Sequence, residues 1–275
     1  MKKMKCAAED YTEADFPATR KEVFSECYRE HFSLIFRLGL VCFLALIPVL
    51  ITMLLRDIYI IGVVEGLAEK TEEKIAAVYY QADAVFGLFQ IGANALFAAL
   101  FAGVIQILRQ LLWNEPVFFG DDFKKGIKSN SLRYFAVAFL LSLTNYALNM
   151  LSGSLVTYIL SGVFIVMILP VSAWFSLQGI YYKSGVLESI KNAVLFYIKT
   201  LPVTILLLVC TTVPFLLANS ITLILAKCAV IIVLALLYIV PLAMCWMLYA
   251  THVFDKFVNK ENYPEIYRKG MRKEI

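Results

Sequence analysis

Apolar residues in this chain gather into six long runs that are separated by polar segments. The runs cover about residues 32–55, 84–112, 132–151, 155–181, 193–217 and 221–250. Each reaches or exceeds the roughly 20 residues that a helix needs to cross about 30 Å of hydrocarbon. Backbone groups inside lipid must be hydrogen-bonded within their own segment, and the alternating segments of a membrane barrel are absent from the sequence. The pattern therefore predicts an all-α integral membrane protein with six transmembrane helices.

The polar segments between the runs predict how the helices pair. Only Ser152, Gly153 and Ser154 separate the third run from the fourth, which predicts a tight antiparallel hairpin. A weak repeat, residues 126–130 before the third run and residues 189–192 before the fifth, extends this arrangement to three hairpins with short amphipathic cytoplasmic helices. The connection over residues 56–83 is rich in acidic residues and predicts an outer loop that holds a small helix.

The chain thus divides into three regions. Residues 1–31 form a cytoplasmic N-terminal segment, residues 32–250 the six-helix transmembrane domain, and residues 251–275 a basic cytoplasmic tail. In the first region, Pro17, Thr19 and Glu22 have the spacing of a capping box, which predicts an interfacial helix that begins there.

A further surface helix is predicted in the charged segment between the second and third runs. Asp121 is its expected N-cap, and its apolar and basic residues fall on opposite faces, which is typical of a helix that lies at a membrane surface. The residues of this predicted helix are Asp121, Phe123, Lys124, Lys125, Ile127 and Lys128.

Basic residues fix the expected orientation in the membrane. Most of the 25 Lys and Arg residues lie in the N-terminal segment, residues 109–133, residues 182–199 and the tail, whereas residues 56–83 hold only three. The positive-inside rule places the basic segments in the cytoplasm, so we expect a cell-membrane protein with both termini cytoplasmic. The net charge of +4 gives no reason to expect a nucleic-acid partner, because the basic residues flank apolar runs. The expected partner of the apolar surface is the lipid bilayer.

Small and polar residues inside the runs predict packing and binding positions. Ala95, Ala99 and Gly103 recur every four residues and form a helix-packing stripe, since small residues let helices approach closely in lipid. Asn94, Asn145 and Asn149 are candidates for a polar pocket near the outer side, or alternatively for hydrogen-bonded helix contacts. Three basic residues lie within or beside the runs: Arg37, Lys199 and Lys227. Each either extends its side chain to the membrane interface or has a functional role, and the sequence leaves both interpretations open.

The sequence lacks the residue patterns of an enzyme. Its two histidines, His31 and His252, lie near the predicted cytoplasmic surface, and its six cysteines have no disulfide or zinc spacing. No Asp or Glu lies inside a predicted span, although intramembrane carboxylates are common in proton-coupled pumps. We therefore expect a protein without catalytic activity, cofactor or bound metal.

The central segment carries a family resemblance. Leu108 and Arg109 are followed by Glu115, then Asp122 and Phe123. Gly126, Lys128 and Asn130 complete the pattern ahead of an apolar helix. In these residues the chain resembles the YesL family of Gram-positive membrane proteins, whose function is unknown. The resemblance implies a six-helix layout and a link to carbohydrate uptake, and no catalytic residue carries over. The acidic connection is longer here than the family pattern leads us to expect.

Two functional hypotheses follow. The first is a non-enzymatic accessory protein that binds a transporter subunit or a second copy of itself. The second is a small-molecule-binding component of a transporter, with a pocket at the three asparagines. A sizeable polar cavity near Asn145 favours the second, and a filled core with an apolar cytoplasmic patch favours the first. Binding of anionic lipid by the basic tail and the Lys124, Lys125 and Lys128 cluster is expected only as anchoring.

Overall fold

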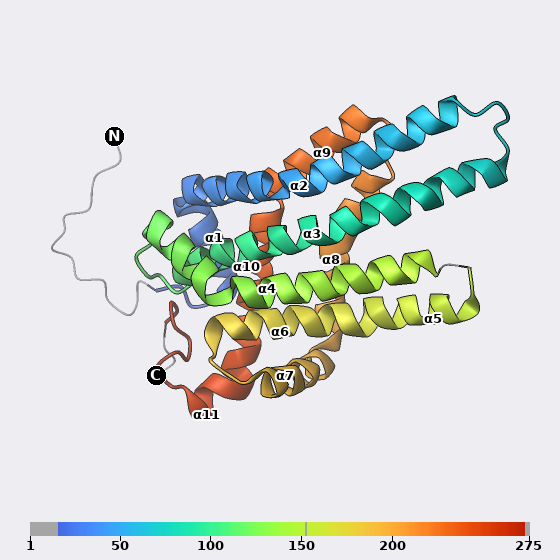
Figure 1. Cartoon of the computed structure of the whole chain (residues 1–275). Helices are drawn as coiled ribbons and strands as arrows, with labels where there is room; N and C mark the ends of the chain where they lie inside the picture. Colours follow the sequence, from blue (N-terminus) through green and yellow to red (C-terminus); the bar gives the residue numbers. More distant parts are fainter. Residues whose placement is uncertain (1–15, 152, 273–275) are drawn as a thin grey trace, which may run out of the picture.

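The computed structural model describes residues 16–151 and 153–272, and all regular elements in those residues are helices (Figure 1). In chain order they are α1 (Arg20–Glu30), α2 (Phe32–Glu65), α3 (Glu72–Leu112), α4 (Phe119–Met150), α5 (Leu155–Val163), η2 (Phe164–Ile168), α6 (Leu169–Tyr181), α7 (Val186–Lys199), α8 (Leu201–Asn219), α9 (Ile224–Leu237), α10 (Ile239–Phe254), η3 (Asp255–Asn259) and α11 (Lys260–Asn262). Parts of the predicted N-terminal segment (1–15), of the hairpin turn (Ser152) and of the tail (273–275) lie outside the described residues.

Within the described part of the chain, four stretches are long and apolar enough to cross a membrane: Phe32–Glu65, Glu72–Leu112, Leu155–Tyr181 and Leu201–Asn219. A fifth is added if Ile224–Leu237 and Ile239–Asn262, which meet at a bend of 44°, form one span. The predicted helical membrane fold is therefore confirmed in outline. The remaining predicted span, residues 132–151, lies in α4, which is not in this set because polar residues such as Asn145 and Asn149 interrupt its apolar sequence.

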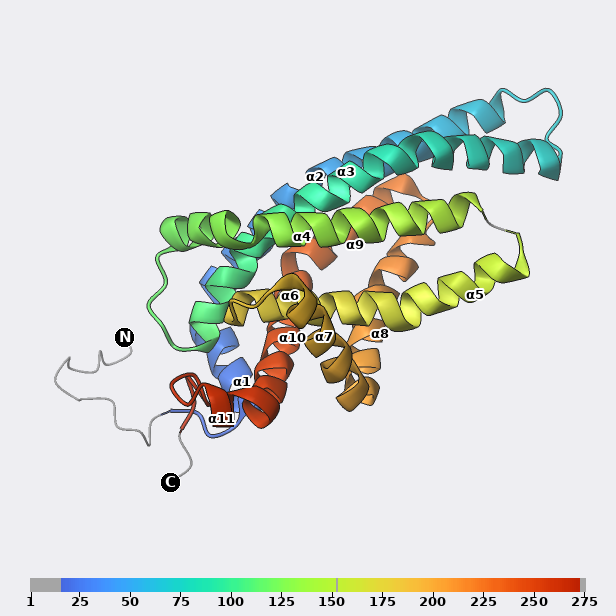
Figure 2. The same cartoon turned by 60° about the horizontal axis from the view of Figure 1, so that its bottom comes forward.

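The helices α2 and α3 are longer than predicted, and the expected outer loop over residues 56–83 is wrong. Only residues 66–71 connect the two helices. The hydroxyl of Thr71 accepts a hydrogen bond from the backbone amide of Lys74, which caps α3, and two glutamates in its first turn complement the helix dipole. The result is a long hairpin whose tip stands apart from the other helices (Figure 2).

The prediction of a separate surface helix that begins at Asp121 is also wrong, because those residues form the first turns of α4. The N-cap is Phe118, and α4 runs unbroken to the far end of the bundle. The buried carboxylate of Asp122 accepts hydrogen bonds from the backbone amide of Phe118 at 2.7 Å and from the side chain of Gln110 at 2.8 Å. These bonds hold the start of α4 against α3, so this segment packs on a helix and not only on a membrane surface.

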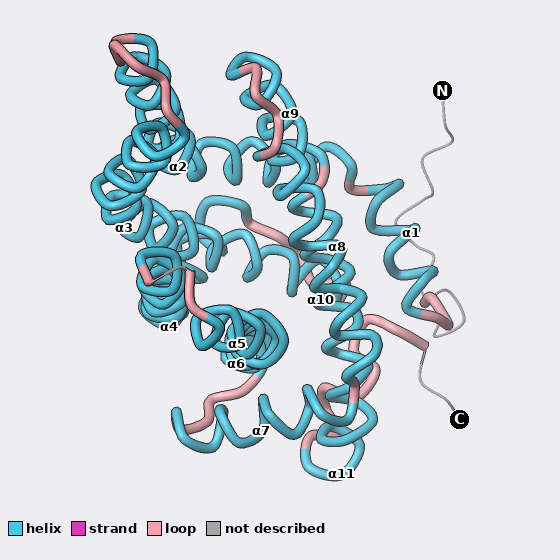
Figure 3. The backbone as a smooth tube through the Cα atoms, turned by 90° about the vertical axis from the view of Figure 1, so that its right-hand side faces the viewer, coloured by secondary structure: helices cyan, strands magenta, loops and turns pink. Residues whose placement is uncertain are grey.

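The predicted fifth and sixth helices each consist of two helices, and a proline accounts for both breaks. Residues 193–217 are divided between α7 and α8 at Thr200, because Pro202 cannot donate a backbone hydrogen bond and its ring crowds the preceding turn. Residues 221–250 are divided between α9 and α10 at Tyr238, three residues before Pro241. As a consequence, α7 runs crosswise to the axis of α5 and α6 (Figure 3).

The start of α1 is the one predicted. Thr19 is the N-cap, and the capping box with Glu22 is complete. The backbone amide of Arg272 donates to the carbonyl of Pro17 at 3.0 Å, so the first and last described residues lie together. Figure 1 shows α1 and α11 at the end of the molecule opposite to the α2–α3 tip.

The densest core lies in the half of the bundle near the chain ends. The Trp174 ring is fully buried against the rings of Phe196, Tyr249 and Phe254, and its indole N–H donates to the hydroxyl of Thr204 at 3.2 Å. In the other half, a much smaller buried apolar cluster joins α2, α8 and α9. The half of the bundle away from the Trp174 core is therefore less filled, which leaves room for a cavity.

Two glycines allow the close contact between α3 and α4. A Cβ atom on Gly103 would lie 2.5 Å from the ring of Phe123. A Cβ atom on Gly126 would lie 2.5 Å from the Cβ of Gln106, 2.9 Å from the Cα of Gly103 and 3.0 Å from the carbonyl oxygen of Ala102. In the predicted stripe, Ala95 and Gly103 are buried and Ala99 is half-buried. The stripe thus lies on α3, and its glycine is at the contact with α4.

Replacement of Gly126 by alanine is expected to lower the stability of the folded protein by about 1–3 kcal/mol, because the added methyl group meets backbone atoms that cannot rotate away. Gly120→Ala on the same helix is the control, since a Cβ atom there meets nothing within 4 Å. Thermal unfolding in detergent measures both. Equal midpoints for the two variants would contradict the close contact.

Candidate binding cavity

A cavity of about 600 Å³ lies between α2, α3 and α4, at the end of the bundle opposite to the chain ends. Figure 3 views the molecule from this end. The middle of the α5–α6 segment and the last residue of α8 complete its wall. All three asparagines predicted as pocket residues, Asn94, Asn145 and Asn149, line it. The structure therefore brings together side chains that lie more than 50 residues apart in the sequence.

One wall of the cavity is a row of amides and a hydroxyl. The side-chain amide of Gln90 donates to Asn94 at 3.0 Å, and the amide of Asn94 donates to the hydroxyl of Ser142 at 3.1 Å. This chain is the helix contact that the sequence left open as an alternative for Asn94. The side chains of Asn145 and Asn149, one turn apart on α4, are exposed, and within the described residues neither amide group has a protein hydrogen-bond partner. Their amides are available to a ligand.

The opposite wall is charged, and the sequence analysis missed it. The guanidinium of Arg56 donates to Asp83 at 2.5 Å and to Asp57 at 3.1 Å. The ammonium of Lys227 donates to the other oxygen of Asp57 at 2.6 Å. Two cations and two carboxylates thus form a network with no net formal charge, which joins α2, α3 and α9 beside the cavity.

One expectation about these residues was wrong. Asp57 and Asp83 lie inside the long helices α2 and α3, so carboxylates do occur in helices that qualify as spans. The sequence left Lys227 open as a snorkelling or a functional cation, and in the structure it is 8 % exposed and paired with Asp57. The sequence did contain one indication of this charged wall: Arg56 directly follows the first predicted apolar run, and Asp83 directly precedes the second.

Aromatic side chains complete the cavity. The hydroxyl of Tyr146 donates to the backbone carbonyl of Ala84 at 3.0 Å, and its ring lies so close to Gly87 that a Cβ atom there would be 2.6 Å away. Phe86 also lines the cavity, and its ring centroid lies 5.8 Å from that of Tyr59. The cavity therefore offers hydrogen-bonding amides, a balanced ion network and aromatic surface. Within the described residues, no group of three or more His, Cys, Asp or Glu side chains is placed to hold a metal ion.

The remaining predicted positions lie away from the cavity. The start of α4 has the predicted polar and apolar faces. Its charged residues are exposed, namely Asp121, Lys124, Lys125 and Lys128, whereas Phe123 and Ile127 are half-buried. Arg37 is exposed on α2. The ammonium of Lys199, at the end of α7, lies 4.4 Å from the ring centroid of Phe257.

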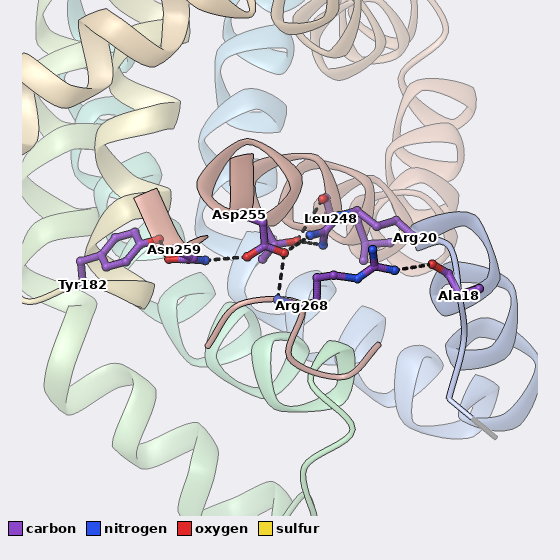
Figure 4. Close-up of polar contacts among 8 residues, drawn as sticks. Ala18, Arg20, Tyr182, Leu248, Asp255, Asn259 and Arg268 are labelled. Atoms are coloured by element: carbon purple, nitrogen blue, oxygen red, sulfur yellow. Dashed lines mark hydrogen bonds and ion pairs between the residues drawn. The ribbon is translucent and has the colours of Figure 1, made fainter. Parts of the chain in front are cut away.

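A second polar cluster, centred on Asp255, lies where the chain ends meet (Figure 4). One carboxylate oxygen of Asp255 accepts from the guanidinium of Arg20 at 2.5 Å and from the backbone amide of Arg268 at 3.2 Å. The other accepts from Asn259 at 2.7 Å, and the hydroxyl of Tyr182 donates to Asn259 at 2.6 Å. The guanidinium of Arg268 also donates to the carbonyl of Ala18 at 3.0 Å. The cluster joins residues near the beginning and the end of the described chain to Tyr182, the C-cap of α6.

Burial perturbs the groups around Asp255. Loss of hydration lowers the pKa of Arg20, and the charge of Asp255 opposes this effect. Burial, with a smaller effect of the charge of Asp255, raises the pKa of Tyr182. The ion pair between Arg20 and Asp255 rests on the geometry of their contact. The raised pKa of Tyr182 keeps its hydroxyl a neutral donor at neutral pH.

No known protein family, curated protein or solved structure matches the chain. The function is therefore argued from the geometry of the cavity.

Proposed function

We propose that this protein is a membrane-embedded binding component of a solute transport system and that its cavity takes a small, uncharged or zwitterionic solute rich in hydroxyl groups. The observation that carries the proposal is the pair of amides on Asn145 and Asn149, which face a cavity of about 600 Å³ without a protein partner. Cavities of about 300–1,000 Å³ with a few convergent polar groups are typical of small-molecule sites.

The charges beside the cavity support this choice of ligand class. Arg56 and Lys227 are balanced by Asp57 and Asp83, so a strongly charged ligand finds no excess of opposite charge. Amide side chains both donate and accept, which suits hydroxyl groups, and the Tyr146 ring offers a flat apolar surface. A neutral carbohydrate meets all of these requirements. The resemblance to the YesL family, which implies a link to carbohydrate uptake, supports the same class of ligand.

The proposal includes six membrane crossings in three hairpins, with both termini in the cytoplasm. Its support is the contact between Arg272 and Pro17, because chain ends that lie together on one side require an even number of crossings. The four single spans and the bent span make five, and α4 is the sixth. Its polar outer half faces the cavity, which accounts for its lower hydropathy. The basic segments then set the orientation.

The alternative is an accessory protein that binds a transporter subunit or a second copy of itself. An apolar groove of about 680 Å³ between α4 and α6 favours it, with Leu140 and Phe175 among its lining residues. The polar cavity favours the binding component, and for that reason we place it first.

Substitution of Asn145 and Asn149 together by alanine is expected to weaken solute binding about tenfold or more, since each lost hydrogen bond is worth about 0.5–1.5 kcal/mol. Sucrose, glucose and glycine betaine serve as probes for the purified protein in detergent, and glutamate and spermidine as charged comparators. Isothermal titration calorimetry measures the affinity.

The control for this experiment is Asn130→Ala, which removes an amide from the same helix outside the cavity. We expect the control to bind like the unmodified protein. The proposal is contradicted if the neutral probes do not bind, if the charged comparators bind more tightly, or if the double variant binds like the control.

A further inference from the structure

A second cavity, of about 470 Å³, lies beside Asp255 at the end of the bundle opposite to the solute cavity. Among the described residues that line it are the cationic side chains of Arg20, Lys256, Lys260 and Arg268, and one carboxylate, Asp255. This described part of the lining carries a formal charge of +3 with histidine neutral. Figure 4 shows the Arg20 side chain at the carboxylate of Asp255, whereas the Arg268 side chain extends from the same place toward Ala18.

The carboxylate of Asp255 is already engaged. Arg20, the backbone amide of Arg268 and the side chain of Asn259 all donate to it, so neither oxygen is left without a donor. Lys256 and Lys260 are exposed, and no carboxylate within the described residues pairs with either. The ammonium of Lys256 lies 5.3 Å from the centroid of the Phe257 ring. Two ammonium groups thus remain uncompensated beside two arginines.

The spacing of these lysines defines the site further. Lys256 and Lys260 are four residues apart, so they lie on one face of the helical segment that follows α10. Like charges at this spacing repel each other, and an anion between them removes the repulsion. A phosphate group has several oxygens that accept charge-assisted hydrogen bonds from lysine and arginine at once. The cavity also lies where α10 ends, at the level at which a helix leaves the membrane in the six-crossing arrangement.

We propose that this cavity binds a phosphate group, from a lipid headgroup or from a soluble phosphate ester, between Lys256 and Lys260 of one helical segment and the arginines at the two chain ends. The bound phosphate adds a second bridge between α1 and the C-terminal segment, next to the existing bridge through Asp255. Phosphate therefore stabilises the fold at a position distant from the solute cavity. This proposal does not depend on solute binding, and only its lipid form rests on the proposed six-crossing arrangement.

The test compares two charge-matched double variants of the full-length protein in neutral detergent. K256Q/K260Q removes the two lysines of the cavity, and K70Q/K74Q removes two exposed lysines with the same spacing at the α2–α3 tip. The soluble probe is glycerol 3-phosphate, with sodium chloride at equal ionic strength as the blank, and the lipid probe is phosphatidic acid in mixed micelles, with phosphatidylcholine as the blank. Thermal unfolding and titration calorimetry are the readouts.

We expect at least one phosphate probe to raise the melting temperature of the unmodified protein and of K70Q/K74Q, and its affinity to fall at least tenfold in K256Q/K260Q. K256R/K260R should restore binding, because arginine keeps the charge. Stabilisation by glycerol 3-phosphate assigns a soluble ligand, and stabilisation by phosphatidic acid alone assigns a lipid. The proposal is overturned if neither probe stabilises the protein more than its blank, or if the two glutamine variants lose affinity equally.

Discussion

Replacement of Asp57 by asparagine is expected to destabilise the folded protein by about 3–5 kcal/mol, the range found when one partner of a buried ion pair is removed. The ammonium of Lys227 lies 2.6 Å from Asp57, and the two side chains are 11 % and 14 % exposed. Among the described residues, Asp57 is the carboxylate that pairs with Lys227, so the variant leaves a nearly buried charge without compensation. Thermal or denaturant unfolding in detergent measures the loss.

A double-variant cycle separates the pair from its surroundings. In Asp57→Asn/Lys227→Met both charges are absent, and we expect much of the stability to return because burial of an unpaired ammonium is avoided. Lys74→Gln is the matched control, since it breaks an exposed pair with Glu69 at 2.9 Å that is worth at most about 1 kcal/mol. If Asp57→Asn costs no more than this control, the pair with Lys227 does not hold α9 against α2.

Gly39→Ala is expected to have the second largest effect, a loss of about 3 kcal/mol or more. A Cβ atom at this position would lie 2.2 Å from the carbonyl oxygen of Leu236 and 3.0 Å from its carbonyl carbon. These are backbone atoms of α9, close to the bend at Tyr238, so the methyl group can be accommodated only if α2 and α9 move apart.

The control on the same helix is Gly62→Ala, where a Cβ atom meets nothing within 4 Å. Alanine is the better helix former by about 1 kcal/mol, so this variant should be as stable as the unmodified protein or more stable. Unfolding midpoints of both variants, measured under the same conditions, test the contact. A Gly39→Ala protein as stable as Gly62→Ala would show that the α2–α9 contact tolerates separation.

Local sequence signals predicted the parts of the fold that depend on neighbouring residues. The span Leu155–Tyr181 has the predicted limits, because a polar turn and a polar segment bound one apolar run. The Thr19 cap was predicted from the three-residue spacing to Glu22. For the α3–α4 contact, the sequence predicted a packing surface on α3 alone, from the small-residue stripe that ends at Gly103, and it did not name the partner helix. Its partner Gly126 was assigned to a surface helix.

The candidate site could be predicted only in part. The asparagines were found because amides are unusual inside apolar runs. The charged wall was missed because Asp57 and Lys227 are 170 residues apart, and no local pattern records such a pairing. The charged ends of α2 and α3 were assigned to a loop because their sequence is polar, whereas in the structure they continue the helices and contact each other through Arg56 and Asp83.

The joined chain ends have a consequence for biosynthesis. Arg20 pairs with Asp255 across 235 residues, and Arg268 reaches Ala18 across 250. Helix α1 leaves the ribosome 235 residues before Asp255, which pairs with its Arg20. The contacts of α1 with Asp255 and Arg268 therefore form only after most of the described chain has been synthesised, and a nascent chain that stalls before Asp255 lacks them.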